Sequence, residues 1–363
     1  MIRGEVISPA PREAWSEVLA ADPDATVYQT PTWLDAVRQA TGGSDASRLY
    51  LLDDGRRLVV PMVRRTPIPG LHLDDSYPAN YGYGGLLAAG GLRPSDVRHT
   101  LTDLLTSRAL STRLKSTPNT AHHWDGGLVP GVVSASRRVE VLDLDGGFDH
   151  IWTRRFESSA RRAVRKAERS GLDVESDTSG RLVPAFYQLY LDWTERRARE
   201  TGMPRAVAAV AARRREPLKK FLAVAATVGE NCRIWVARHE GVPIASIITL
   251  VHGAHASYWR GYSDKAVAGP LRANNLLHRL AIEDALAAGC RFYSMGESGG
   301  VGALEKFKQT LGATPRRAVD CRIERLPISR AAAVKGRVEA AATRLLSARC
   351  RHAGPIPDRD GGT

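Results

Sequence analysis

The sequence predicts a mixed α/β protein of two domains, each with a mixed central sheet flanked by helices. Its 363 residues are about twice the length of a typical single domain. Hydrophobic residues make up 43% of the chain and charged residues 25%, which is ordinary for a globular protein and too apolar for a disordered one. Helical and strand-like patterns alternate in both halves. We expect domains at 1–145 and 146–327, followed by a basic helix and disordered tail at 328–363.

The N-terminal half combines helices with a strand hairpin. Proline near the start and glycine after the end mark its helices, which we expect at 11–21, 30–40 and 94–109. Strand-like runs with a turn signal at 53–56 between the first two lie at 49–53, 58–64 and 139–144. The segment 67–78 has no regular pattern. The glycine-rich run 81–85 could line a pocket, but we favour a bulged strand packed on the core.

The C-terminal half has a more regular order. Amphipathic helical patterns, one of them interrupted by Pro217, occur at 148–156, 160–170, 182–200, 207–228, 273–288 and 303–311. Strand-like runs occur at 232–239, 243–251, 256–262, 291–295 and 317–325. The order is an antiparallel meander followed by a β-α-β-α-β crossover, which is neither a barrel nor a Rossmann order.

This order is the one seen in acyltransferases of the GNAT fold, and four segments resemble motifs of the FemABX group of two-domain GNAT-type proteins. They are the Q-T-P-T-W of 29–33, the basic helix of 159–172, the T-E-R-R and glycine of 194–202, and the F-K-Q-T-L-G of 307–312. The resemblance implies tandem GNAT-like domains and one reaction, in which an amine attacks an activated acyl ester or thioester. FemABX proteins take the acyl group from aminoacyl-tRNA.

Two residues are the candidates for catalysis. The resemblance places Lys308 near the acyl-transfer centre, where an ammonium group would stabilise the negative charge on the carbonyl oxygen. Glu297, in the glycine-rich loop 296–302, could hold the attacking amine or accept its proton. The alternative for Lys308 is an ordinary exposed lysine on a short helix.

A basic helix is the candidate site for phosphate or RNA. Its cations form two adjacent stripes opposed by Glu168 alone, so an anionic partner would relieve their repulsion; they are Arg161, Arg162, Arg165, Lys166 and Arg169. Arg272, at the start of a later helix, could contact another phosphate. The alternative is a solvated helix face.

Further side chains are candidates for substrate binding. Tyr258, Arg260 and Tyr262 alternate along a predicted strand, so we expect them to face one side and line a cleft between the domains. Arg197 and Arg205 come from the T-E-R-R region. Arg38 stands beside Val37, which occupies the position of a phosphate-binding lysine in FemX-type enzymes, so a nucleotide-linked acceptor is disfavoured.

The choice of donor rests on charge and on a missing motif. The net charge is +13, and 44 of the 52 basic residues are arginine, which suits an anionic partner or reflects composition bias. The strict pyrophosphate loop of CoA-dependent enzymes is absent, because Gly269-Pro270 supplies one glycine and removes an N–H donor. We therefore expect aminoacyl-tRNA as donor and a cell-wall precursor or natural-product amine as acceptor. Acyl-CoA transfer to a sugar amine or peptide, and a non-catalytic nucleic-acid-binding protein, remain alternatives.

Cysteine spacing, hydropathy and histidine positions indicate the cellular compartment and the absence of a metal site. The four cysteines are far apart and form no C-x-x-C pair, which favours a reduced, cytoplasmic chain. No stretch reaches the length of a membrane-spanning helix, and no signal peptide is recognised. We expect His122-His123 in a loop, and neither a metal site nor a bound cofactor.

Overall fold

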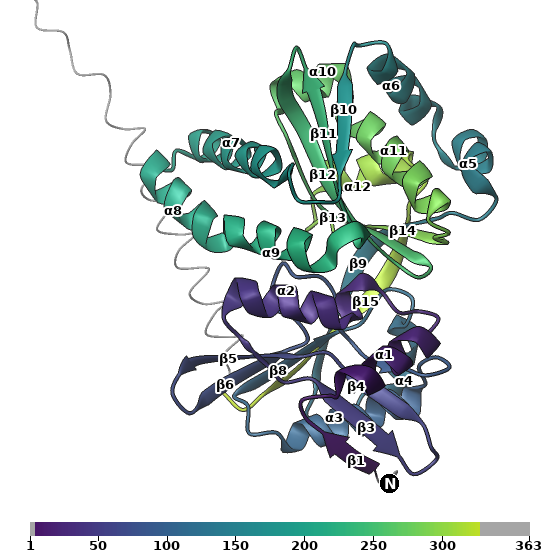
Figure 1. The fold of residues 1–363 in the computed structure, drawn as a ribbon, viewed down its shortest axis with the longest axis vertical. Helices are drawn as coiled ribbons and strands as arrows, with labels where there is room; N and C mark the ends of the chain where they lie inside the picture. The colour runs from purple at the N-terminus through teal and green to yellow at the C-terminus, as the bar shows by residue number, and fades with distance from the viewer. Residues whose placement is uncertain (1–3, 327–363) are drawn as a thin grey trace, which may run out of the picture.

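The computed structural model describes residues 4–326 and contains two sheets with helices on their faces (Figure 1). The strands of the first half are β1 (Gly4–Ile7), β2 (Ser44–Asp45), β3 (Arg48–Leu52), β4 (Arg57–Val60), β5 (Val63–Ile68), β6 (Leu71–Asp75), β7 (Leu87–Ala88), β8 (Ser111–Lys115) and β9 (Val133–Asp143). Those of the second half are β10 (Asp173–Asp177), β11 (Cys232–His239), β12 (Val242–His252), β13 (His255–Ser263), β14 (Phe292–Gly296) and β15 (Thr314–Glu324).

Helices surround both sheets. In the first half they are α1 (Arg12–Ala21), α2 (Pro31–Thr41), α3 (Pro94–Thr106) and α4 (Ala121–Gly127). In the second half they are α5 (Gly147–His150), α6 (Ser158–Glu168), α7 (Val183–Thr201), α8 (Arg205–Arg215), α9 (Leu218–Val228), α10 (Lys265–Leu271), α11 (Ala273–Ala287) and α12 (Gly302–Thr310). None of the helices within residues 4–326 is long and apolar enough to cross a membrane.

The larger sheet runs through both halves of the molecule. Its eleven strands have the order β10-β11-β12-β13-β14-β9-β15-β8-β6-β5-β2, while β1-β3-β4-β7 form the second sheet. β10 to β13 are antiparallel, and β14 lies parallel to β13 after the crossover through α11. The predicted meander and crossover are therefore confirmed. β15 lies between β9 and β8, so a strand made late in the chain pairs with one of the first half.

One hydrophobic core joins the halves. Trp33 and Leu34 of α2 belong to the same buried cluster as Phe221 and Val224 of α9, and these two helices pack side by side (Figure 1). The rings of Trp33 and Trp259, from opposite halves, meet edge to face with their centroids 5.3 Å apart. The cleft between the halves is thus closed by apolar packing on this side.

Some local expectations were wrong. The segment 67–78 was expected to be irregular, but it contains β6 and the end of β5, joined by a tight turn at Gly70, whose φ is +79°. His122 and His123 lie in α4 rather than in a loop. The predicted domain boundary at 145 stays a prediction, and the basic helix expected at 328–363 lies outside the described residues.

Candidate functional site: the Glu297 cavity

A small cavity lies where strands of both halves meet. It is bounded by the loop of Ala79, Asn80 and Tyr83, by β8, β9 and β15, and by Glu297, and its volume is about 180 Å³. Glu297 follows β14 directly and is exposed, so its carboxylate is accessible to a ligand. The cavity therefore combines an exposed carboxylate of the second half with polar side chains of the first.

Lys308 lies behind this cavity. Its side chain is only 1% exposed, and its Nζ donates hydrogen bonds to the main-chain oxygens of Gly296 (2.9 Å) and Glu297 (3.0 Å). Burial lowers the pKa of Lys308 to about 8, opposed by the negative charges of Glu140, Glu297 and Glu305. The amine thus fixes the chain that carries Glu297 and places a titratable positive charge beside it.

Glu140 is a further carboxylate that the sequence did not reveal. It is 1% exposed on β9, opposite Gly296 of β14 in the sheet. Its Oε1 accepts a 2.7 Å hydrogen bond from Arg138, while Oε2 is buried and has no hydrogen-bond partner within residues 4–326. Its charge opposes the effect of burial on the pKa of Lys308, which makes it part of the same electrostatic unit.

Residues 154–309 match the family model described as an acetyltransferase (GNAT) domain. The chain carries a GNAT-type acyltransferase domain. Its loop 296–300, with Glu297, and Lys308 of α12 both lie inside the matched residues. The acyltransferase class predicted from the sequence is therefore confirmed, whereas the roles of single residues stay predictions.

Solved structures show the same fold. FemX is similar over 87% of this chain and 96% of its own, with a TM-score of 0.59 and 12% identity. A conserved protein of unknown function from Bacteroides thetaiotaomicron is similar over 89% of this chain and 100% of its own, with a TM-score of 0.52 and 10% identity. At these identities the similarity concerns the fold, and the predicted FemX-like GNAT fold is confirmed. No curated protein sequence matches the chain.

The strand residues of the GNAT-type domain do not all face one side, so that expectation was wrong. A bulge in β13 leaves Trp259 between the pairs that Tyr258 and Arg260 form with β12. Tyr258 consequently packs on the α11 side, beside His278 at 4.8 Å between ring centroids. Tyr262 packs on the opposite side with Tyr190 of α7. The period-two pattern could not reveal this, because one extra residue reverses the faces beyond it.

Arg260 belongs to a buried polar group at the junction of the halves. Its Nη2 donates to the main-chain oxygen of Asn80 at 2.6 Å, and its Nε lies 3.4 Å from Glu216. Lys220 of α9 lies 2.5 Å from Glu216 and donates to the same Asn80 oxygen. Since Asn80 lines the Glu297 cavity, Arg260 acts on that cavity through the loop of the first half.

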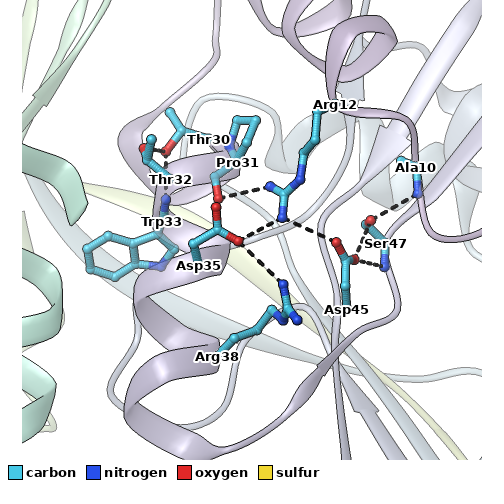
Figure 2. A network of polar contacts seen from close by, with 10 residues as sticks. All are labelled: Ala10, Arg12, Thr30, Pro31, Thr32, Trp33, Asp35, Arg38, Asp45 and Ser47. Atoms are coloured by element: carbon cyan, nitrogen blue, oxygen red, sulfur yellow. Dashed lines mark hydrogen bonds and ion pairs between the residues drawn. The ribbon is translucent and has the colours of Figure 1, made fainter.

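Three predicted substrate-binding arginines lie elsewhere and have partners. Figure 2 shows Arg38 on α2 reaching Asp35, which also binds Arg12. Arg197 pairs with Glu200 along α7, and Arg205 binds Glu195 at 2.6 Å across the α7–α8 groove. None of the three lines the Glu297 cavity. The structure therefore does not bring these three arginines together with Glu297 and Lys308, the proposed catalytic residues.

The basic helix of the GNAT-type domain is α6, at the end of the second half farthest from the first half (Figure 1). Arg161 points inward, and its Nη1 donates to the main-chain oxygens of Trp152, Thr153 and Phe156. The other cations are exposed and form no ion pair within residues 4–326; they are Arg162, Arg165, Lys166 and Arg169. Glu168 pairs with Arg279 of α11 at 3.8 Å, and so leaves this row unneutralised.

Arg272 is exposed between α10 and α11 in the left-handed conformation, with φ of +60°. Pro270 lies inside α10, in the stretch where a CoA-dependent enzyme would need free N–H groups. In a CoA-dependent enzyme α11 would follow a pyrophosphate-binding loop. Here α11 follows α10, a helix that contains Pro270.

Proposed function

We propose that the protein transfers an aminoacyl group from aminoacyl-tRNA to an amine that enters the Glu297 cavity. The observation that carries this proposal is the row of four exposed cations on α6 and its C-terminal cap, which form no ion pair among residues 4–326 and lie within a GNAT-type acyltransferase domain. Such a row suits the phosphates of RNA and supplies affinity without reading sequence. The helix-with-proline before α11 supports the choice of tRNA over CoA as donor.

The chemistry of this transfer balances without a cofactor. The amine nitrogen forms a bond to the carbonyl carbon of the ester, the ester C–O bond breaks, and the terminal hydroxyl of the tRNA leaves with a proton. Glu297 accepts the proton that the amine loses and passes it to the leaving oxygen of the tRNA. Lys308 positions Glu297 through its two hydrogen bonds, and its charge favours the negative oxygen of the tetrahedral intermediate.

The decisive experiment offers purified protein a pool of charged tRNAs and a panel of amines, with amide products read by mass spectrometry. We expect an amide that requires the protein and disappears after ribonuclease treatment. Glu297→Gln should slow its formation by about 100-fold, the scale of general-base catalysis. Product with an acyl-CoA pool and none with charged tRNA would show that the donor is acyl-CoA.

A cell-wall precursor and a natural-product scaffold are the two acceptor classes to include in the panel. The similarity to FemX concerns the fold and does not choose between the two classes. Localisation in the cytoplasm, where charged tRNA is found, is part of the same proposal.

A further inference from the structure

The Glu297 cavity is small for a catalytic pocket. Its volume of about 180 Å³ is below the roughly 300–1,000 Å³ of pockets that hold drug-sized ligands. A nucleotide or a sugar chain does not fit inside it. The cavity suits a group of a few atoms, such as the end of an acceptor molecule.

Positive charge is in excess around this cavity. The Asp320 carboxylate on β15 is bound by Arg113 (2.8 Å), by Arg137 (3.2 Å) and by Arg322 (3.3 Å). Asp320 is 1% exposed, so its single negative charge is fully engaged by three guanidinium groups. Glu297 is the other carboxylate that lines the cavity, and its side chain has no hydrogen-bond or ion-pair partner among residues 4–326.

Lys115 adds a fourth positive charge to the same wall. It ends β8 and is half-buried, and its amine has no hydrogen-bond or ion-pair partner among residues 4–326. Burial, and next the charge of Arg113, lower the pKa of Lys115 to about 8, opposed by Asp320, Glu297 and Asp75. Partial burial makes the charged form of this amine less favourable, and an anion beside it would offset this effect.

The two charged features lie in one cavity and have opposite signs. The Lys115 amine and the partly exposed Arg137 can bind a negative group, while Glu297 can bind an amine. A simple alkylamine would meet mainly repulsion from the cations. A molecule with an amine and an anion a few bonds apart complements both sides.

We propose that the acceptor is an amino carboxylate, either a small amino acid or the amino-acid end of a larger molecule, whose carboxylate binds Lys115 and Arg137. The identity of this ligand as acceptor rests on the proposed function, but its binding does not. The carboxylate holds the molecule so that its amine faces Glu297. Lys115 thereby determines which amines are accepted.

The test follows the Lys115 amine by NMR in the full chain labelled with [13Cε]lysine, which contains eight lysines. The Lys115→Arg variant assigns the resonance, and exposed Lys219 is the internal control. A pH titration is run alone, with ω-amino carboxylates from glycine to 6-aminohexanoate, with their methyl esters, and with inorganic phosphate. We expect at least one amino carboxylate to raise the pKa of Lys115 by about one unit, a tenfold preference for the protonated form.

The outcomes are distinct. A rise with an amino carboxylate that is absent with its ester and at Lys219 supports the proposal. An unchanged Lys115 with every amino carboxylate, an equal rise with the esters, or a rise with phosphate alone overturns it. The titration contains no acyl donor. Its result therefore tests ligand binding even if the protein fails to transfer an aminoacyl group. Transfer to amines that lack a carboxylate, with equal efficiency, would overturn the acceptor assignment while upholding the proposed function.

Discussion

The Lys220 amine of α9 lies 2.8 Å from the main-chain oxygen of Asn80, a residue 140 positions earlier in the chain. The same amine lies over the rings of Tyr81 and Trp259, at 4.3 and 5.1 Å from their centroids. Asn80 has a positive φ of 71° and lines the Glu297 cavity. The buried amine thus fixes the wall of the cavity that the first half supplies.

Replacing Lys220 with Met should destabilise the protein by about 3–5 kcal/mol, because Glu216 would keep a buried charge without its closest partner. Urea unfolding measures this loss. Lys219→Met, on the exposed side of the same helix, is the control and should change stability by no more than about 0.5 kcal/mol.

The double variant Lys220→Met with Glu216→Gln removes both charges of the pair. It should recover part of the lost stability, because the uncompensated carboxylate is gone. Equal instability of the single and double variants would contradict the assignment of the loss to charge.

Asp320 should make stability depend on pH in the acid range. Burial raises the pKa of Asp320, but the hydrogen bond from Arg113 and then that from Arg322 outweigh it and lower the pKa to about 2. A carboxyl group whose pKa is lower in the folded state stabilises the fold above about pH 4 and loses this effect as pH falls to about 2.

The Asp320→Asn variant should therefore lose about 2 kcal/mol at pH 7 and show a flatter decline between pH 4 and 2 than the parent. Urea unfolding across this range compares the two. Asp54→Asn, in the exposed hairpin turn, is a suitable control, and parallel curves for parent and D320N would contradict the prediction.

The exposed row on α6 should govern binding to RNA. Replacing Arg162, Arg165, Lys166 and Arg169 with Ala should weaken tRNA binding and reduce the slope of log affinity against log salt by about 3. Fluorescence anisotropy at several salt concentrations measures both. The matched control removes four exposed cations of α8 and α9, Arg213, Arg214, Arg215 and Lys219.

Equal loss in the control would mean that net charge, and not α6, determines binding. Arg161 needs separate treatment, because its side chain supports the turn before α6 through three main-chain oxygens. Arg161→Ala should lower stability by about 1.5–3 kcal/mol. Its effect on tRNA affinity should be smaller than that of the exposed row.

Amide formation should decline above about pH 8 if the Lys308 ammonium group is required. Burial lowers the pKa of Lys308 to about 8, so the charged form is lost as pH rises through this value. The pH profile of kcat in the Lys115→Met variant isolates this effect, because Lys115 titrates in the same range. An unchanged kcat up to pH 9.5 in that variant would exclude a role for the Lys308 charge.

The sequence predicts those elements whose signals are local. α7, for example, has a complete amphipathic pattern and ends at Gly202, which takes the left-handed conformation that closes a helix. β6 was missed because Pro67 and Gly70 hide a short hairpin, and the bulge in β13 was missed because nothing in its composition marks it.

The residues of the candidate site also fall into those that the sequence predicts and those that it does not. Lys308 was found because it lies in a segment that resembles a family motif, and Glu297 because it lies in the glycine-rich loop before that segment. Lys115 and Asp320 are isolated charges that meet through the pairing of β8 with β15, and Glu140 comes close to Lys308 through the pairing of β9 with β14. No local sequence pattern predicts contacts between residues of such distant strands.

The position of β15 also determines when the larger sheet can be completed during synthesis. β8 pairs with β15 on one side, yet 199 residues separate Lys115 from Thr314. At about 5–20 residues per second, the ribosome needs roughly 10–40 s to make the missing partner. Throughout that interval the growing chain presents an unpaired strand edge, the kind of surface on which chains aggregate and chaperones act.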